Sequence, residues 1–335
     1  MIRRICKSIY LIRILVQWLF KLIFRDGRSD SVSCLVGKTA VVTGGNSGIG
    51  YAVSTLLASR GCKVIIADVQ NSEESTKQIK EDTGNSNVTW KHLDLSSFSS
   101  IRDFAKEVNH EEGKVDILIN NAGIGISKTK VTTDNLNKVM QINFFGPFLL
   151  THLLVDSLKA TKKARVLFAS SIQAFQSNLT LKNLTEELNP LEFNVEDVGK
   201  SLELYCNSKL CNIFSAQEFA DKLGKYGIRV NSADPGAVFT ELFLSGHDFE
   251  VWYMKIVRML RIFRLMLYFI GEDNFGGAQT LFHLASSKNI ENVTGQNYFR
   301  CRPFVKPSIL DDPRFCYELW KKTEAIVKLS QEEKL

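Results

Sequence analysis

The sequence predicts an α/β protein, a single domain built on a doubly wound parallel sheet of about seven strands. From Gly37 onward, short apolar or β-branched runs alternate with longer stretches of helical spacing. Apolar strands separated by helices are typical of a parallel sheet covered on both faces. A Gly-rich turn after the first run marks a change from strand to helix. The predicted strands are Thr39–Thr43, Lys63–Asp68, Val88–Leu93, Val115–Asn120, Ala164–Ser170, Arg229–Asp234 and Gln296–Phe299.

The charge of the chain is unevenly distributed. The net charge is +6, and residues 1–28 hold seven basic side chains against one acid, so the other 35 basic and 35 acidic residues cancel. A neutral body with a basic head argues against a broad nucleic-acid surface and favours a local anionic partner, such as a membrane surface. The seven cysteines form no Cys-x-x-Cys pair and the five histidines form no metal-ligand motif, which predicts reduced thiols and no metal site.

The first 30 residues are expected to form a membrane-anchoring segment. Arg13, Gln17, Lys21 and Arg25 recur at every fourth position, so on a helix they form one polar stripe opposite bulky apolar side chains. This pattern favours a helix lying in the membrane interface. A spanning helix, which needs about 20 mostly apolar residues, remains an alternative, as do a signal peptide and a mitochondrial presequence.

Two further regions complete the predicted organisation. A catalytic domain is expected over residues 37–300, followed by a C-terminal extension over 301–335 that contains a capping helix. Within the domain, Val251–Ile270 carries four basic residues and no acid beside an apolar stripe. Two interpretations of this stretch remain: a helix packed on the core, or a helix that contacts a membrane or covers the substrate.

The turn at Thr43–Gly50 has the chemistry to hold a dinucleotide. Gly44, Gly48 and Gly50 would let the backbone approach a pyrophosphate, whose charge is favoured at a helix N-terminus. Asp68 ends the second predicted strand, 18 residues after Gly50, where a carboxylate can bind the ribose hydroxyls. Because the same charge would repel a 2′-phosphate, NAD(H) is favoured, and NADP(H) remains the alternative.

A second group of residues could carry acid–base chemistry. Tyr205 and Lys209 lie four residues apart, so they share one face of a helix, and a lysine cation there would lower the tyrosine pKa. The Ser170-Ser171 pair ends an apolar run, where a substrate oxygen could be held. The spacing alone is weak evidence, because Tyr317–Lys321 repeats it.

Several motifs follow one another in a fixed order: the Thr43–Gly50 turn, Asp94, Asn120–Gly123, Asn143, the serine pair, Tyr205–Lys209, and Pro235-Gly236 with Thr240. With these motifs in this order, the chain resembles the short-chain dehydrogenases/reductases from about Gly37 to Phe299. The resemblance implies that Tyr205 is the general acid/base, Ser171 holds the substrate oxygen, Lys209 binds the nicotinamide ribose and Asn143 orders a proton-relay water. Ser170 remains an alternative to Ser171. The residues expected to bind the cofactor are Gly44, Asn46, Ser47, Gly48, Ile49, Gly50, Asp68, Asp94, Asn121, Ala122, Gly123, Tyr205, Lys209, Pro235, Gly236 and Thr240.

One departure from the common family pattern narrows the resemblance. Ser171 and Tyr205 are 34 residues apart, and the intervening polar segment at about 176–202 is longer than in most members. This gap is similar to that of the retinol dehydrogenase-like branch, which acts on lipophilic alcohols and aldehydes at membranes. The branch implies a retinoid, steroid or other lipid substrate. It also implies endoplasmic reticulum or lipid-droplet membranes with a cytosolic-facing domain, or else a mitochondrial membrane. The family resemblance leaves a homodimer open as the assembly.

Two rival functions are kept beside an NAD(H)-dependent alcohol oxidoreductase. The enzymatic rival is an NADP-dependent carbonyl or retinal reductase. The rival of another class is a non-catalytic nucleotide-binding scaffold at a membrane or lipid droplet, against which the intact Asn143, Ser171, Tyr205 and Lys209 set argues.

Overall fold

The computed structural model describes residues 27–125, 131–191, 198–236 and 273–335. Almost all of the predicted membrane segment, the Val251–Ile270 stretch and Thr240 therefore lie outside the described residues. Among the residues that are described, no helix has the length and hydropathy needed to cross a bilayer.

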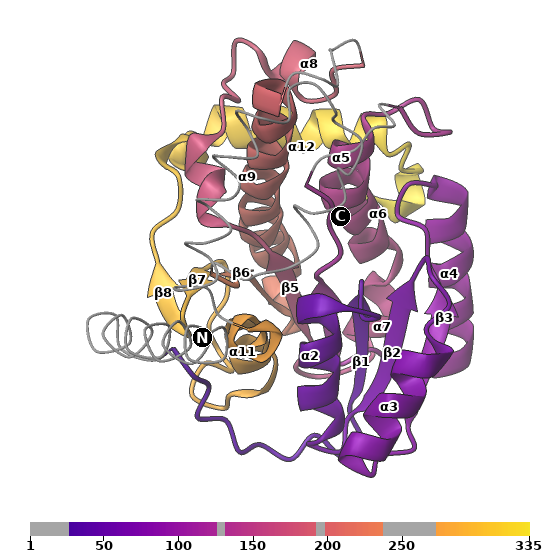
Figure 1. Cartoon of the computed structure of the whole chain (residues 1–335). Helices are drawn as coiled ribbons and strands as arrows, with labels where there is room; N and C mark the ends of the chain where they lie inside the picture. The colour runs from indigo at the N-terminus through magenta and orange to yellow at the C-terminus, as the bar shows by residue number, and fades with distance from the viewer. Residues whose placement is uncertain (1–26, 126–130, 192–197, 237–272) are drawn as a thin grey trace, which may run out of the picture.

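The domain is organised around one eight-stranded sheet in the order β3-β2-β1-β4-β5-β6-β7-β8 (Figure 1). The first seven strands pair in parallel, and β8 pairs antiparallel with β7 at the edge. The doubly wound prediction is confirmed, with one strand more than expected. The strands are β1 (Thr39–Thr43), β2 (Lys63–Asp68), β3 (Val88–His92), β4 (Ile117–Asn120), β5 (Arg165–Ala169), β6 (Arg229–Asp234), β7 (Asn297–Phe299) and β8 (Arg302–Phe304).

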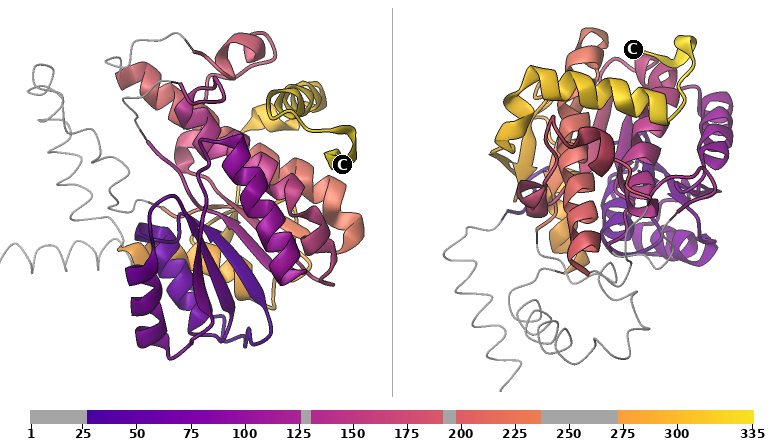
Figure 2. Two further views of the ribbon diagram at one scale, coloured as in Figure 1. Left: turned by 90° about the vertical axis from the view of Figure 1, so that its right-hand side faces the viewer. Right: turned by 90° about the horizontal axis from the view of Figure 1, so that it is seen from above.

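Helices cover both faces of the sheet, as its apolar strands require (Figure 2). One face carries α2 (Gly48–Ala58), α3 (Glu73–Thr83) and α11 (Asn274–Ser286). The other carries α4 (Phe98–Glu112), α6 (Gly146–Leu153), α7 (Val155–Lys159), α9 (Val198–Leu223) and α12 (Pro313–Ile326). The shorter elements are α5 (Lys138–Met140), η1 (Gln141–Phe145), η2 (Ile172–Gln176), α8 (Leu184–Glu187), η3 (Gly224–Tyr226), η5 (Ser308–Asp311) and η6 (Gln331–Glu333).

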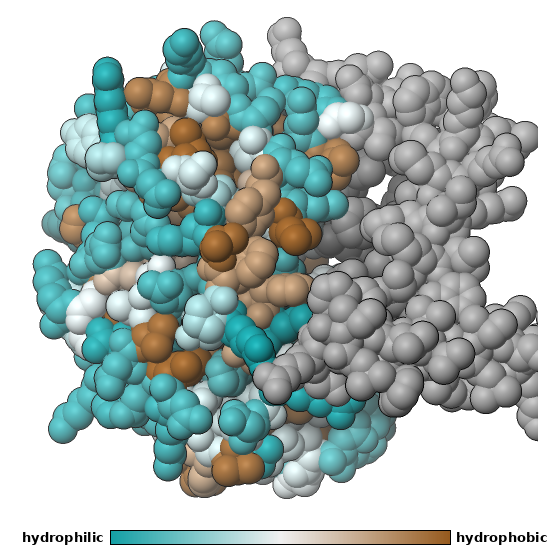
Figure 3. Space-filling model, turned by 90° about the vertical axis from the view of Figure 1, so that its left-hand side faces the viewer, coloured by the Kyte–Doolittle hydropathy of each residue, from teal (hydrophilic) through white to brown (hydrophobic). Residues whose placement is uncertain are grey.

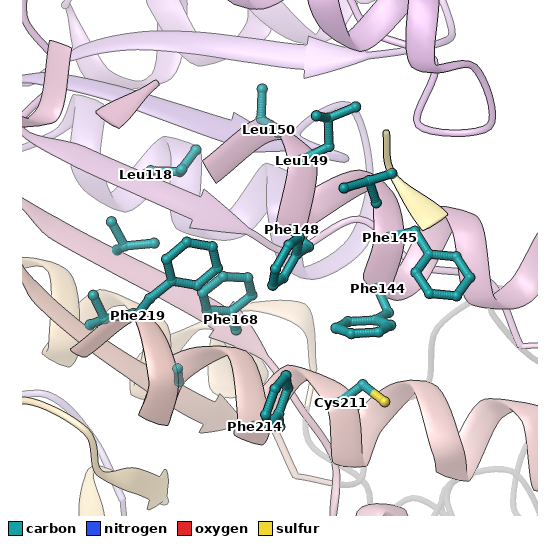
Figure 4. Close-up of a cluster of buried hydrophobic side chains, with 14 of the residues drawn as sticks. Leu118, Phe144, Phe145, Phe148, Leu149, Leu150, Phe168, Cys211, Phe214 and Phe219 are labelled. Carbon is teal, nitrogen blue, oxygen red and sulfur yellow. The ribbon is translucent and has the colours of Figure 1, made fainter. Parts of the chain in front are cut away.

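Aromatic side chains pack the helices α6, α9 and α12 against the second face of the sheet. Phe148 of α6, Phe219 of α9 and Phe168 of β5 are fully buried and their rings lie against one another (Figure 4). Trp320 of α12 closes this cluster, with its ring 4.8 Å from that of Phe148. Burying such a side chain contributes about 2–3 kcal/mol, so the cluster fixes α9 firmly against the sheet. That matters for function because α9 carries the Tyr205–Lys209 pair.

The C-terminal residues 301–335 are packed on the same domain. Strand β8 extends the sheet, and Phe315 and Leu319 of α12 are fully buried in the core. Helix α12 begins with Pro313 after Asp312, whose side chain accepts hydrogen bonds from the first helical amides. This start signal is typical of a stable helix. Residues 301–335 therefore form part of the folded domain.

Candidate active site

A cavity of about 630 Å³ lies at the carboxyl ends of the central strands. Strands β1 and β4 are adjacent in the sheet. After β1 the chain continues to β2 on one side, and after β4 it continues to β5 on the other. Open α/β sheets bind ligands at such a point, where the strand order reverses. Every parallel strand from β1 to β6 contributes lining residues at or just after its end. These residues include Gly44, Asp68, Asp94, Asn121, Ser170 and Pro235.

The floor of the cavity depends on close backbone approach at two glycines. Gly44 has φ = +65°, and a Cβ built there would lie 2.9 Å from the Ala122 Cα atom. A Cβ on Gly50 would lie 2.0 Å from the Gly44 carbonyl oxygen, so Gly50 lets the first turn of α2 pack on the loop. Only glycine fits at either position. The arrangement aims the amino end of α2 at the cavity, where a pyrophosphate would be favoured.

Asp68 is held in place by the turn opposite it. Its Oδ2 atom accepts a hydrogen bond from the Asn46 amide at 3.2 Å, and its Oδ1 atom accepts one from the Gln70 amide at 3.1 Å. The Asn46 side chain is fixed in turn by the hydroxyl of Ser75 at 2.7 Å. Among the described residues that line the cavity, Lys209 is the one cation, and it sits at the other end.

The loop after β4 is tied to the end of β1. The amides of Asn121 and Ala122 both donate to the Thr43 hydroxyl oxygen at 3.0 Å, and the Asn121 side chain donates to the Thr43 carbonyl. A methyl group built on Gly123 would lie 3.3 Å from Asn143 Oδ1 and 3.6 Å from Lys209 Nζ. Gly123 therefore leaves the space in which these two side chains converge.

Asn143 lies in the π-helical turn η1, a departure from regular helix that recurs at functional sites. Its Oδ1 atom accepts from the Ile124 amide at 2.8 Å, and its Nδ2 group donates to the Ile124 carbonyl and to Ser208 Oγ. Because Ser208 directly precedes Lys209, Asn143 links the loop after β4 to the α9 face that carries the tyrosine and lysine.

The two serines have different environments. Ser170 is buried and lines the cavity, and its hydroxyl donates to the Lys209 carbonyl oxygen at 2.9 Å. Ser171 lies outside the cavity lining, and its side chain hydrogen-bonds Tyr205. Lys209 Nζ lies 5.4 Å from the centre of the Tyr205 ring and donates to the Ala169 carbonyl at 3.0 Å. Ser171, not Ser170, is thus the serine whose side chain acts on the pKa of the phenol.

Burial sets the protonation of both α9 residues. It raises the pKa of Tyr205, the nearby Asp234 charge raises it further, and the Ser171 hydrogen bond opposes them. Burial lowers the pKa of Lys209 to about 8. This differs from the expectation that Lys209 lowers the tyrosine pKa, because desolvation of the phenol outweighs any effect of the cation in this site.

Most of the predicted site residues come together around one space. Those that line the cavity are Gly44, Asn46, Ser47, Gly48, Ile49, Asp68, Asp94, Asn121, Ala122, Gly123, Tyr205, Lys209 and Pro235. Gly50 and Gly236 lie in turns next to the cavity lining. Asn143 hydrogen-bonds Ile124, and Ser171 acts on Tyr205, and both of these partners line the cavity. Thr240 lies outside the described residues.

Sequence reasoning missed two contributors. Asn274, at the start of α11, lines the cavity from a segment more than 35 residues beyond Pro235. Asp234, directly before Pro235, is a buried carboxylate whose charge acts on both Tyr205 and Lys209. An acid at the end of a predicted strand, directly before a Pro-Gly turn, is the sequence signal that could have identified Asp234, whereas nothing in the local sequence marks Asn274.

The residues fit a bound dinucleotide. The cavity has the size of a small-molecule site, glycines remove side chains where a backbone must approach, and Asp68 and Lys209 lie at its two ends. The fold and this cavity define a nucleotide-dependent oxidoreductase of the doubly wound class.

Comparisons with known proteins agree. The family model described as short chain dehydrogenase matches residues 38–183. Dehydrogenase/reductase SDR family member 13 from Bos taurus is 34% identical over 90% of this chain and 76% of its own length. Retinol dehydrogenase 11 from Homo sapiens is 36% identical over 82% of this chain and 81% of its own. A crystal structure of an uncharacterised protein from Mycobacterium paratuberculosis has a TM-score of 0.68 at 24% identity, over 90% of this chain and 97% of that one.

The chain belongs to the short-chain dehydrogenase/reductase family. It is accordingly an NAD(P)-dependent oxidoreductase acting on CH–OH donors, and the dehydrogenase sequence relatives extend over the α9 segment that the family model does not reach.

Proposed function

We propose that the protein is a membrane-associated enzyme that interconverts a lipophilic alcohol and its carbonyl with NAD(H). The observation that carries this proposal is the buried Tyr205 beside Lys209, whose Nζ atom lies 5.4 Å from the ring centre, at one end of a cavity whose other end holds Asp68. The bound nicotinamide supplies the hydride chemistry, and the protein supplies orientation and proton transfer.

Tyr205 is the proton donor and acceptor in this mechanism. In reduction the phenol donates its proton to the forming alcohol oxygen. In oxidation its oxygen takes the proton of the substrate hydroxyl as the phenol passes its own proton to the water that Asn143 orders. Ser171 holds the same substrate oxygen, since its hydroxyl already meets the phenol. Lys209 binds the nicotinamide ribose, and Asn143 holds the loop after β4 and orders a water through Ser208 and the Ile124 carbonyl.

Asp68 supports the preference for NAD(H). Its carboxylate is fixed by the amides of Asn46 and Gln70, so it cannot easily turn away from a ribose at that end of the cavity. A 2′-phosphate there would meet a fixed negative charge, with no cation among the described lining residues on that side to offset it.

Two features support a lipophilic substrate. Relatives at 31–36% identity carry the name retinol dehydrogenase, and retinol is an apolar alcohol. Directly after Ser171, Ile172 and Phe175 are exposed, and the Phe175 ring lies 5.9 Å from that of Phe304 on β8. Figure 3 shows apolar side chains gathered near the middle of the face that carries these elements. An apolar surface beside the phenol suits a hydrocarbon chain better than a sugar or an acid.

The experiment is a titration of the full chain in detergent with NADH and with NADPH. Wild type should bind NADH at least about tenfold more tightly, a difference of about 1.4 kcal/mol. Asp68→Asn should remove most of that preference. Asp94→Asn is the matched control, because it neutralises a second cavity carboxylate and should weaken both nucleotides alike.

Oxidation of all-trans-retinol with NAD, followed by absorbance of the aldehyde, tests the substrate class. Tighter binding of NADPH would favour the NADP-linked carbonyl reductase. Binding of neither nucleotide would favour the scaffold.

A further inference from the structure

Asp234 is a buried carboxylate that has no role in the proposed proton transfer. It ends strand β6, and only 3% of its surface is exposed. Its Oδ1 atom accepts a hydrogen bond from the Gly236 amide at 2.8 Å, and the carboxylate also accepts one from the Ile172 amide. These amides belong to the loops after β6 and after β5. A charged group in such a place is costly unless charge or hydrogen bonds offset its desolvation.

Lys209 presents the opposite problem in the same region. Its ammonium group is as deeply buried as Asp234, and it donates a hydrogen bond to the Ala169 carbonyl at 3.0 Å. Ala169 pairs with Ala233, the residue directly before Asp234, so the lysine and the carboxylate lie at the ends of adjacent strands. Desolvation lowers its pKa to about 8, and the charge of Asp234 acts against that lowering. Burial raises the pKa of Asp234 above its ordinary value, while the Gly236 and Ile172 amides and the charge of Lys209 favour its ionised form.

The other groups around Lys209 do not carry a charge near neutral pH. Burial raises the pKa of Tyr205 and that of Cys206, its neighbours on α9, so both are neutral. Strand β5 and the turn after it offer the Ala169 carbonyl and the hydroxyl groups of Ser170 and Ser171, and η1 offers the Asn143 amide. From β7, Phe299 pairs with Asp234 and is apolar. Among the described residues, Asp234 is thus the charge that acts on Lys209.

We propose that Asp234 is a positioning residue that keeps the buried Lys209 charged and so sets the upper pH limit of dinucleotide binding. The inference rests on the proposed function, because it requires Lys209 to hold the nucleotide. In this proposal Asp234 acts through Lys209 and does not itself touch substrate or cofactor. By the same charge, Asp234 holds the proton on Tyr205.

The test measures NADH affinity of the full chain in detergent between pH 6 and pH 10, by fluorescence titration. In wild type, affinity should fall as pH rises through about 8, where Lys209 loses its proton. Removing the Asp234 charge makes that loss easier. In Asp234→Asn the midpoint should therefore move down by about one pH unit, which leaves binding about tenfold weaker at pH 9 and within about twofold at pH 6.

Three comparisons separate charge from structure. Asp234→Asn keeps an oxygen for the Gly236 and Ile172 amides, while Asp234→Ala removes both oxygens, so a charge effect gives the same shift in both variants. Asp116→Asn is the matched control, because Asp116 is equally buried and paired with Lys38, at the opposite end of the sheet. It should leave the midpoint unchanged.

Two outcomes would overturn the inference while leaving the proposed function intact. One is NADH binding by wild type that stays constant from pH 6 to pH 10, which needs no variant to fold. The other is an unshifted midpoint in Asp234→Asn with weakening only in Asp234→Ala, the result expected of a carboxylate that merely pins two loops. Absence of NADH binding at every pH would instead overturn the proposed function itself.

Discussion

The hydroxyl of Ser170 donates a hydrogen bond to the carbonyl oxygen of Lys209 at 2.9 Å. This bond joins the end of β5 to the middle of α9, and it occupies the one hydroxyl of Ser170 in a structural role. The neighbouring Ser171 is left to meet the phenol of Tyr205. The adjacent serines therefore have separate tasks, which mutation can distinguish.

We predict that Ser171→Ala and Ser170→Ala fail in different ways. Ser171→Ala should lower kcat by about 10² or more while the midpoint of thermal unfolding stays close to that of wild type. Ser170→Ala should lower the free energy of unfolding by about 1 kcal/mol, because the Lys209 carbonyl loses a buried partner. Steady-state kinetics and thermal denaturation of both variants check this. Equal loss of kcat in the two would contradict the division of tasks.

Tyr205→Phe should abolish proton transfer without disturbing the fold. The variant retains the buried ring and loses only the hydroxyl, so kcat should fall by at least about 10²-fold while NADH affinity stays within about threefold. Tyr317→Phe is the matched control. Tyr317 and Lys321 repeat the same spacing on α12, but 62% of the Tyr317 surface is exposed and the pair lies away from the cavity. A large effect of the control would mean that spacing alone misled the assignment.

Acid should destabilise the fold through His152. This side chain lies among the rings of Phe148, Phe219 and Trp320, and burial lowers its pKa to about 4. An unfolded histidine binds its proton at about 6.5, so the unfolded state takes up more protons between these values. The contribution of neutral His152 is complete above pH 6.5 and is lost as pH falls toward 4. The loss amounts to about 3 kcal/mol.

Chemical denaturation between pH 7 and pH 4 measures that loss. His152→Phe should flatten the pH dependence, because it retains a ring in the cluster and cannot take up a proton. His110→Gln serves as the control, since His110 is exposed at the end of α4 and should leave the slope unchanged. An unaltered slope in His152→Phe would assign the acid sensitivity to other groups.

Residues 1–30 should carry an inert soluble reporter to a membrane surface. The segment combines a polar stripe that includes Arg13, Lys21 and Arg25 with bulky apolar side chains. Co-sedimentation with anionic vesicles should therefore exceed that with neutral ones. Replacing the three basic residues by glutamine should weaken binding at least about tenfold, since each basic residue contributes about 1 kcal/mol at such a surface. A fusion that stays in the supernatant with both vesicle types would contradict the membrane proposal.

Much of the fold could be predicted from local pattern. The ends of β1, β2 and β6 coincide with the predicted runs, because each run is bounded by a turn and the first two are mostly apolar. β8 was not predicted: its three residues carry no periodicity, and only the edge left open by β7 makes them a strand. The π-helical turn at Asn143 was also missed. The Asn143 side chain in this turn bonds Ile124 and Ser208, 19 and 65 residues away in the chain, and a local pattern does not reveal such contacts.

The sequence by itself determined the order of strands and helices, the glycine turn, the acid at the end of β2 and the shared helical face of Tyr205 and Lys209. These follow from short-range spacing, to which the periods of strand and helix respond directly. Only the tertiary structure decided which serine meets the phenol, and that burial raises the tyrosine pKa. It alone brought Asp234 to Lys209, because desolvation and charge depend on distances between segments that are remote in the chain.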